Sequence, residues 1–115
     1  IDIQYQNNFS FLDELFYNAI NQKLYGVTSN GTDDYGNLVE INPNDGSTTI
    51  ISNENLYLSQ SRTFNSNTSE LYFSDFQSYP PKLLKININN GNSSTIDIQY
   101  QNNFSFLDEL INITY

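Results

Sequence analysis

Residues 38–51 read LVEINPNDGSTTII, and residues 83–96 read LLKININNGNSSTI. In both stretches an apolar, partly alternating run is followed by a turn-forming run and then by a second run suited to a strand. The turn has a physical basis, because Pro43 presets φ and Asp45 followed by Gly46 tolerates positive φ. Each stretch predicts a β-hairpin, and together they predict that one structural unit occurs twice. The pairs shared at an offset of 45 residues are Leu38/Leu83, Ile41/Ile86, Asn42/Asn87 and Gly46/Gly91.

The repeat extends to the preceding residues of each unit. FYNAINQKLYG at 16–26 aligns with TFNSNTSELYF at 63–73, at an offset of 47 residues. The pairs retained there are Asn18/Asn65, Leu24/Leu71 and Tyr25/Tyr72. The two offsets differ because the loop region GVTSNGTDDYGN is longer than its partner FSDFQSYPPK. The repeating unit is therefore about 45–47 residues long.

No stretch shows a sustained helical period, so the sequence predicts an all-β chain. Strands are expected near residues 9–17, 23–29, 37–42, 47–52, 70–75, 82–88 and 93–100, with a further strand in LSQSRTFN at 58–65. The side chains expected to be buried are Leu24, Tyr25, Val39, Ile41, Leu71, Tyr72, Leu84 and Ile86. Four antiparallel strands per unit of this length are typical of a β-propeller blade, and a β-sandwich is the alternative.

The run NAINQKLYGVTSNGTDDYGNLVEINPNDGSTTII at 18–51 resembles the blade pattern of TolB-like, YWTD-like and quinoprotein-like propellers. ELYFSDF at 70–76 resembles a relaxed YWTD box, with Phe73 where Trp is usual and Ser74 where Thr is usual. The resemblance covers nearly the whole chain and implies two four-stranded antiparallel blades. It implies a fold and no particular activity, because propellers have many functions.

The segment IDIQYQNNFSFLDEL occurs at 1–15 and again, unchanged, at 96–110. It joins the outer strand of one expected blade to the inner strand of the next. Two blades cannot close a propeller, which typically has 4–8, so we expect a ring or array that other copies complete by strand exchange. The expected divisions are a first junction copy at 1–15, blade one at about 9–57, blade two at about 58–100, a second junction copy at 96–110 and a terminal tail at 111–115.

Composition excludes several function classes. The net charge is -9, and the basic residues are too few and too dispersed for nucleic acid or an anionic membrane. No apolar run approaches the length needed for membrane insertion. With no Cys, His or Met, thiolate and imidazole chemistry and the corresponding metal and haem ligands are excluded. We therefore expect a chain that is not an enzyme and has no cofactor.

An acidic composition rich in Asn and Ser and poor in Lys favours an extracellular or cell-surface location. In that setting N-x-[ST] sequences are candidate N-glycosylation sites. They occur at Asn8, Asn30, Asn67, Asn92, Asn103 and Asn112.

One loop is a candidate calcium site. SNGTDDYGN at 29–37 gathers the oxygen-bearing side chains of Asn30, Asp33, Asp34 and Asn37. Ca²⁺ takes 6–8 oxygen ligands, but the spacing matches no EF-hand pattern and the second unit lacks the acidic pair. The sequence thus favours a solvated loop and predicts no metal site.

Three aromatic residues in loops, Tyr35, Phe76 and Tyr79, are candidates for stacking on sugar rings, with surface packing as the alternative. The adjacent carboxylates at 13–14 and 108–109 could serve glycoside hydrolysis, but nothing in the sequence sets their separation. Acidic residues lining a wet channel are the simpler interpretation. The sequence therefore predicts a structural or binding module that assembles with itself, with a carbohydrate-binding lectin as the alternative.

Overall fold

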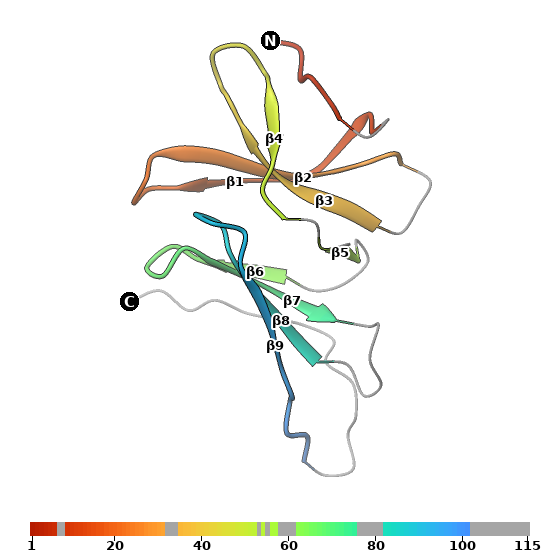
Figure 1. Ribbon diagram of the computed structural model, residues 1–115, viewed down its shortest axis with the longest axis vertical. Helices are drawn as coiled ribbons and strands as arrows, with labels where there is room; N and C mark the ends of the chain where they lie inside the picture. Colours follow the sequence, from red (N-terminus) through yellow and green to blue (C-terminus); the bar gives the residue numbers. More distant parts are fainter. Residues whose placement is uncertain are drawn as a thin grey trace. The chain divides into compact units, whose positions relative to one another are not determined.

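The computed structural model describes residues 1–6, 9–31, 35–52, 54, 56–57, 62–75 and 82–101. Over this part of the chain the secondary structure is β throughout, with no helix, which confirms the all-β prediction. None of these residues forms a helix that is long and apolar enough to cross a membrane. The chain divides into two compact units, Ile1–Leu58 and Ser59–Tyr115 (Figure 1).

The first unit contains an antiparallel sheet in which neighbours in sequence are neighbours in space. Its strands are β1 (Phe11–Asn18), β2 (Lys23–Ser29), β3 (Tyr35–Ile41) and β4 (Thr48–Ile50), in that order across the sheet. A fifth strand, β5 (Leu56–Tyr57), pairs with the beginning of β3. The pairing of β1 with β2 is irregular between Leu12 and Glu14, which places Asp13 at a bulge.

The second unit repeats the four-strand order. Its strands are β6 (Arg62–Asn65), β7 (Glu70–Asp75), β8 (Lys82–Asn87) and β9 (Ser93–Ile96), again paired antiparallel between neighbours. The expected bounds of β2 and β7 are confirmed to the residue. β9 ends at Ile96, four residues earlier than the expected end at 100, because Ile96 already pairs with Leu83 and β8 begins only one residue before that.

Matching turns show that the two units are built alike. Gly46 and Gly91 have positive φ values of 77° and 76°. In each turn the glycine N–H donates to a carbonyl four residues earlier, that of Asn42 or Asn87, at 2.8 Å. Glycine adopts this left-handed conformation without a steric penalty, so its place in the repeat follows from the turn.

The core of each unit lies on its central strands. β2 and β3 supply most of it in the first unit and β7 and β8 in the second. The most buried apolar side chains are Tyr25, Val27, Leu38, Val39, Ile41, Leu56, Leu71, Phe73, Leu84, Ile86 and Ile88. Six of the eight side chains expected to be buried are among them, whereas Leu24 and Tyr72 are only partly buried. Leu24 lines a surface groove, and Tyr72 directs its hydroxyl to the carboxylate of Glu70 at 3.2 Å.

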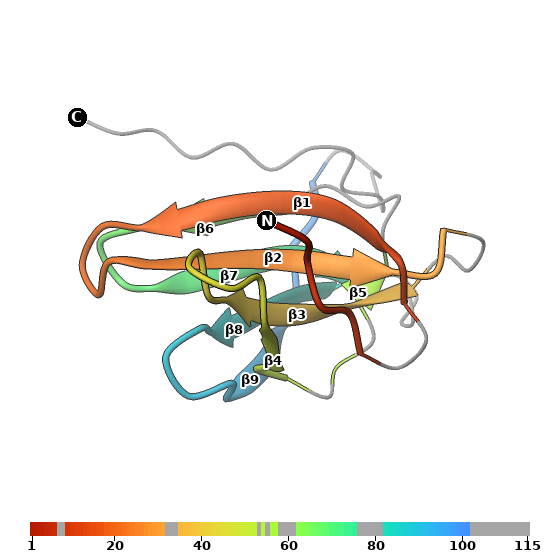
Figure 2. The ribbon, with the colours of Figure 1, turned by 90° about the horizontal axis from the view of Figure 1, so that it is seen from above.

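In the first unit, β3 is buried on both faces of the sheet. Side chains alternate between faces along a strand, and the consecutive residues Leu38 and Val39 are both buried. Part of one face is covered by the first residues of the chain. Figure 2 shows the red N-terminal segment near the hairpin that joins β3 to β4. Gln4 forms a parallel bridge with Ser47, just before β4, and its N–H donates to the carbonyl of Gly46 at 2.7 Å.

Candidate functional site

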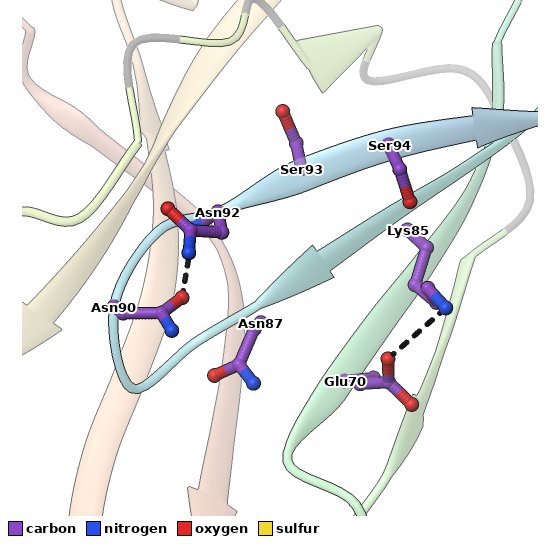
Figure 3. A pocket seen from close by; sticks show the side chains of 7 residues that line it. All are labelled: Glu70, Lys85, Asn87, Asn90, Asn92, Ser93 and Ser94. Atoms are coloured by element: carbon purple, nitrogen blue, oxygen red, sulfur yellow. Dashed lines mark hydrogen bonds and ion pairs between the residues drawn. The ribbon is translucent and has the colours of Figure 1, made fainter.

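A polar pocket of about 280 Å³ lies in the second unit, over β7, β8 and the turn that leads into β9 (Figure 3). Every side chain that lines it is polar. The lining residues are Glu70, Lys85, Asn87, Asn90, Asn92, Ser93 and Ser94. Sequence analysis identified only Asn92 among them, and only as a glycosylation site.

Glu70 is the electrostatic centre of the pocket. Its Oε2 lies 3.5 Å from Nζ of Lys85, and its Oε1 accepts a hydrogen bond from the Tyr72 hydroxyl at 3.2 Å. The Thr68 side chain, and after it Tyr72 and Lys85, hold the pKa of Glu70 below its ordinary value, against the opposing effect of burial. Burial, followed by the neighbouring charge of Glu70, raises the pKa of Tyr72. Near neutral pH the site therefore presents a carboxylate and a neutral phenol.

Asparagine side chains shape the opposite end of the pocket. Asn90 Oδ1 accepts a hydrogen bond from the N–H of Asn92 at 2.9 Å, and Asn87 Oδ1 accepts one from the N–H of Asn89 at 2.9 Å. These bonds fix the orientation of the two amide groups. Amides, hydroxyls and one ion pair suit hydrogen bonding to a neutral polar ligand. A serine nucleophile with an imidazole base is excluded, because the chain has no His.

The first unit has an ion pair at the same place with the charges exchanged. Lys23 Nζ lies 3.2 Å from Glu40 Oε1. At the repeat offsets, Lys23 aligns with Glu70 and Glu40 aligns with Lys85. Opposite charges that face each other across neighbouring strands stabilise the pairing of those strands, whichever strand carries the positive charge. This alignment is also the sequence signal that could have located the pocket.

The candidate calcium loop is only partly described. Asn37 is buried in β3, and its Nδ2 lies 3.4 Å from the carbonyl of Gly36. Asn30 is half-buried. Asp33 and Asp34 lie outside the described residues. Across the described ranges, no group of three or more acidic side chains is arranged to hold a metal ion.

The aromatic and acidic candidates do not converge on one site within the described structure. Tyr35 begins β3 and is 39% exposed, whereas Phe76 and Tyr79 lie outside the described residues. Asp13 is exposed at the bulge of β1, and Glu14 beside it is half-buried. The second carboxylate pair, at 108–109, also lies outside the described part.

The structure describes three of the six candidate glycosylation sites. Asn67 and Asn92 are exposed on turns, and Asn30 is half-buried. A glycan on Asn92 would occupy the mouth of the polar pocket, since Asn92 lines it. The remaining three sites, Asn8, Asn103 and Asn112, lie outside the described residues.

Comparison of the chain with protein-family models, curated proteins and solved structures found no match.

Proposed function

We propose that the protein is a non-enzymatic module that assembles with copies of itself, its two sheets serving as β-propeller blades in a ring or array. The observation that carries the proposal is a row of exposed apolar side chains on β1. Leu15 and Tyr17 are each 55% exposed, and they share one face of the strand because they are two residues apart. Ile20, in the turn that follows, is 61% exposed.

Such a row favours burial against another sheet. Contiguous exposed apolar surface on a protein typically marks an interaction site. β3 of the same unit is buried on both faces, as expected for a sheet that stacks in a repeat. The matching turns and the ion pairs with reversed charges support the proposal that the two sheets are equivalent blades, since they occupy aligned positions in the two units.

The composition supports the remaining parts of the proposal. An acidic chain with few basic residues suits neither nucleic acid nor an anionic membrane as partner, which leaves the chain itself as the principal partner. We place the assembly outside the cell or at its surface. The side chains that line the polar pocket are suited to hydrogen bonding, which fits a binding module.

We expect the intact protein to sediment at a multiple of its chain mass of 13.2 kDa. Replacing Leu15 and Tyr17 together with serine should shift it toward the single-chain mass, because the exposed apolar row is lost while the buried core is retained. Analytical ultracentrifugation at several concentrations measures this. An Asn44→Ser variant, altered in an exposed turn, is the control and should sediment like the intact protein. A single-chain mass for the intact protein at all concentrations would contradict the proposal.

Carbohydrate binding is the second candidate, and the polar pocket favours it. Its amides and hydroxyls are groups that hydrogen-bond sugar hydroxyls, and Tyr35 offers an exposed ring in the other unit. We expect such binding to show on a glycan array and to weaken in an Asn90→Ala variant. Binding that the Asn90→Ala change leaves intact would remove the pocket from consideration.

A further inference from the structure

We propose that the groove on the first unit that holds residues 1–6 also accepts residues 96–101 of a second copy, which links the copies head to tail. The proposal rests on the proposed self-assembly and names the segment and the surface that carry it. Both segments read IDIQYQ. The duplicated sequence thus supplies one groove with two possible occupants, one from the same chain and one from another.

The groove combines an apolar wall with the turn before β4. A hollow of about 220 Å³ is lined by the apolar side chains of Ile1, Ile3, Leu12, Leu15, Leu24 and Ile41 and by the turn residues Asn42, Pro43 and Gly46. Within the described residues, the segment adds a parallel partner to the outer edge of the sheet at Ser47. Addition of an extended segment to an exposed sheet edge is a recurring mode of peptide recognition.

Two glutamines make the polar contacts of the bound segment. Gln4 donates from its N–H to the Gly46 carbonyl at 2.7 Å and from its Nε2 to the Asp45 carbonyl at 3.1 Å. Its own carbonyl accepts a hydrogen bond from the Thr48 hydroxyl at 2.5 Å. Gln6 donates from its side-chain amide to the Thr48 carbonyl. The groove therefore recognises the segment through backbone atoms and one hydroxyl group.

Gly46 makes the close approach possible. A Cβ at this position would lie 2.0 Å from the carbonyl oxygen of Asp2, and the φ of 77° is unfavourable for other residues. Any side chain here would displace the segment. Gly91 occupies the matching turn of the second unit with a φ of 76°, which makes it a matched control position.

The second copy of the sequence begins at the end of β9. β9 ends at Ile96, so residues 97–101 follow the last strand of the described structure. Their burial matches that of the first copy: Asp97, Gln99 and Gln101 are exposed like Asp2, Gln4 and Gln6, and Ile98 and Tyr100 are half-buried like Ile3 and Tyr5. Asp97 pairs with Lys82 at 3.3 Å, but its side chain is 81% exposed, and an exposed ion pair holds a segment weakly.

Because the two segments are identical in sequence, they can make the same contacts with the groove. Residues 1–6 have the advantage of belonging to the same chain, which corresponds to a high effective concentration. Residues 1–6 therefore limit head-to-tail linkage. Substitutions that weaken the binding of residues 1–6 to the groove should favour linkage between copies. The same substitutions in residues 96–101 should reduce that linkage.

The test applies one pair of substitutions to each copy in the full chain. In a Gln4→Ala/Gln6→Ala variant the groove opens, and a fluorescein-labelled IDIQYQ peptide should bind, by fluorescence anisotropy, about tenfold or more tightly than to the intact protein. The average mass in sedimentation should rise, and unlabelled peptide should lower it again. A Gln99→Ala/Gln101→Ala variant, the matched control, should show no gain in peptide binding and a lower average mass than the intact protein.

Two further measurements locate the contact. Adding Gly46→Ala to the Gln4→Ala/Gln6→Ala variant should abolish peptide binding, whereas adding Gly91→Ala should not. A peptide reading IDIAYA lacks both side-chain amides and should bind the Gln4→Ala/Gln6→Ala protein more weakly than IDIQYQ does, and this comparison does not depend on whether the Gly46→Ala protein folds. Equal effects of the paired substitutions in the two copies, or no peptide binding to the opened groove, would overturn the inference. Leu15 lines the groove and Tyr17 does not, so a Tyr17→Ser variant separates the two proposals: assembly could still be lost in that variant if the groove inference failed.

Discussion

Replacing Leu71 with alanine is expected to lower the free energy of unfolding by about 2–5 kcal/mol. Leu71 lies in the middle of the second sheet, in β7, between Phe64 on β6 and Ile86 on β8. Its side chain is 0% exposed. Truncation removes buried methyl groups and leaves a cavity that the two flanking strands prevent from closing. The protein therefore loses the transfer free energy of the methyl groups and also bears the cost of the cavity.

Urea denaturation followed by circular dichroism measures this change, at one protein concentration because association alters apparent stability. Asn44→Ser is the control. Asn44 is exposed in a turn and lies outside the apolar row on β1, so its replacement should change the free energy of unfolding by less than about 0.5 kcal/mol. Equal effects of the two substitutions would show that Leu71 does not lie in a packed core.

Replacing Gly26 with alanine is expected to destabilise the first unit by about 1–3 kcal/mol, through overpacking. A Cβ at this position of β2 would lie 2.6 Å from Cδ1 of Leu12, 2.9 Å from the carbonyl oxygen of Glu14 and 3.0 Å from Cδ1 of Ile41. One of these neighbours is backbone, so it cannot turn aside as a flexible side chain can. The added methyl group would therefore shift β1 or strain the sheet.

A second variant tests the cause. Adding Leu12→Ala removes the nearest side chain, so the double variant should be less destabilised than the sum of the two single variants. Denaturant unfolding of all four proteins gives the coupling energy. Additive losses would mean that Leu12 does not limit the space at Gly26.

Gly26 also shows how far the repeat predicts packing. At the offset of 47 residues it aligns with Phe73, whose side chain is 1% exposed. A glycine and a buried phenylalanine thus occupy equivalent strand positions. In the first unit the space beside this position is filled by Leu12 from β1. Alignment identifies the position, but the neighbouring strand decides which residue it can hold.

The strands that sequence predicted well are those with long patterns and clear turns. β2 and β7 have their expected bounds, because each lies directly after a turn that aligns in both units. β5 was missed, since two residues are too few to show a period. The bulge at Asp13 was also missed, because it depends on how β1 pairs with β2 and not on the residues of β1 alone.

The polar pocket could not be predicted from any single stretch. Glu70, Lys85 and Ser94 come from three different strands. They come together only through the register, in which Lys85 pairs with Ser94 and with Tyr72, two residues from Glu70. The loop motifs that were candidate sites in the sequence were local groupings of residue types. A local grouping of residues shows which side chains are close in sequence. The polar pocket instead consists of side chains that strand pairing brings together.

By itself the sequence determined an all-β chain, two copies of one strand order and the turns at Gly46 and Gly91, because alternation and turn chemistry act over a few residues. Only the tertiary structure decided what the duplicated segment does. Gln4 of the first copy bridges to Ser47 just before β4, whereas Ile96 of the identical segment ends β9 and pairs with Leu83. Identical sequences have identical local preferences, so the difference arises from the neighbours that each copy meets.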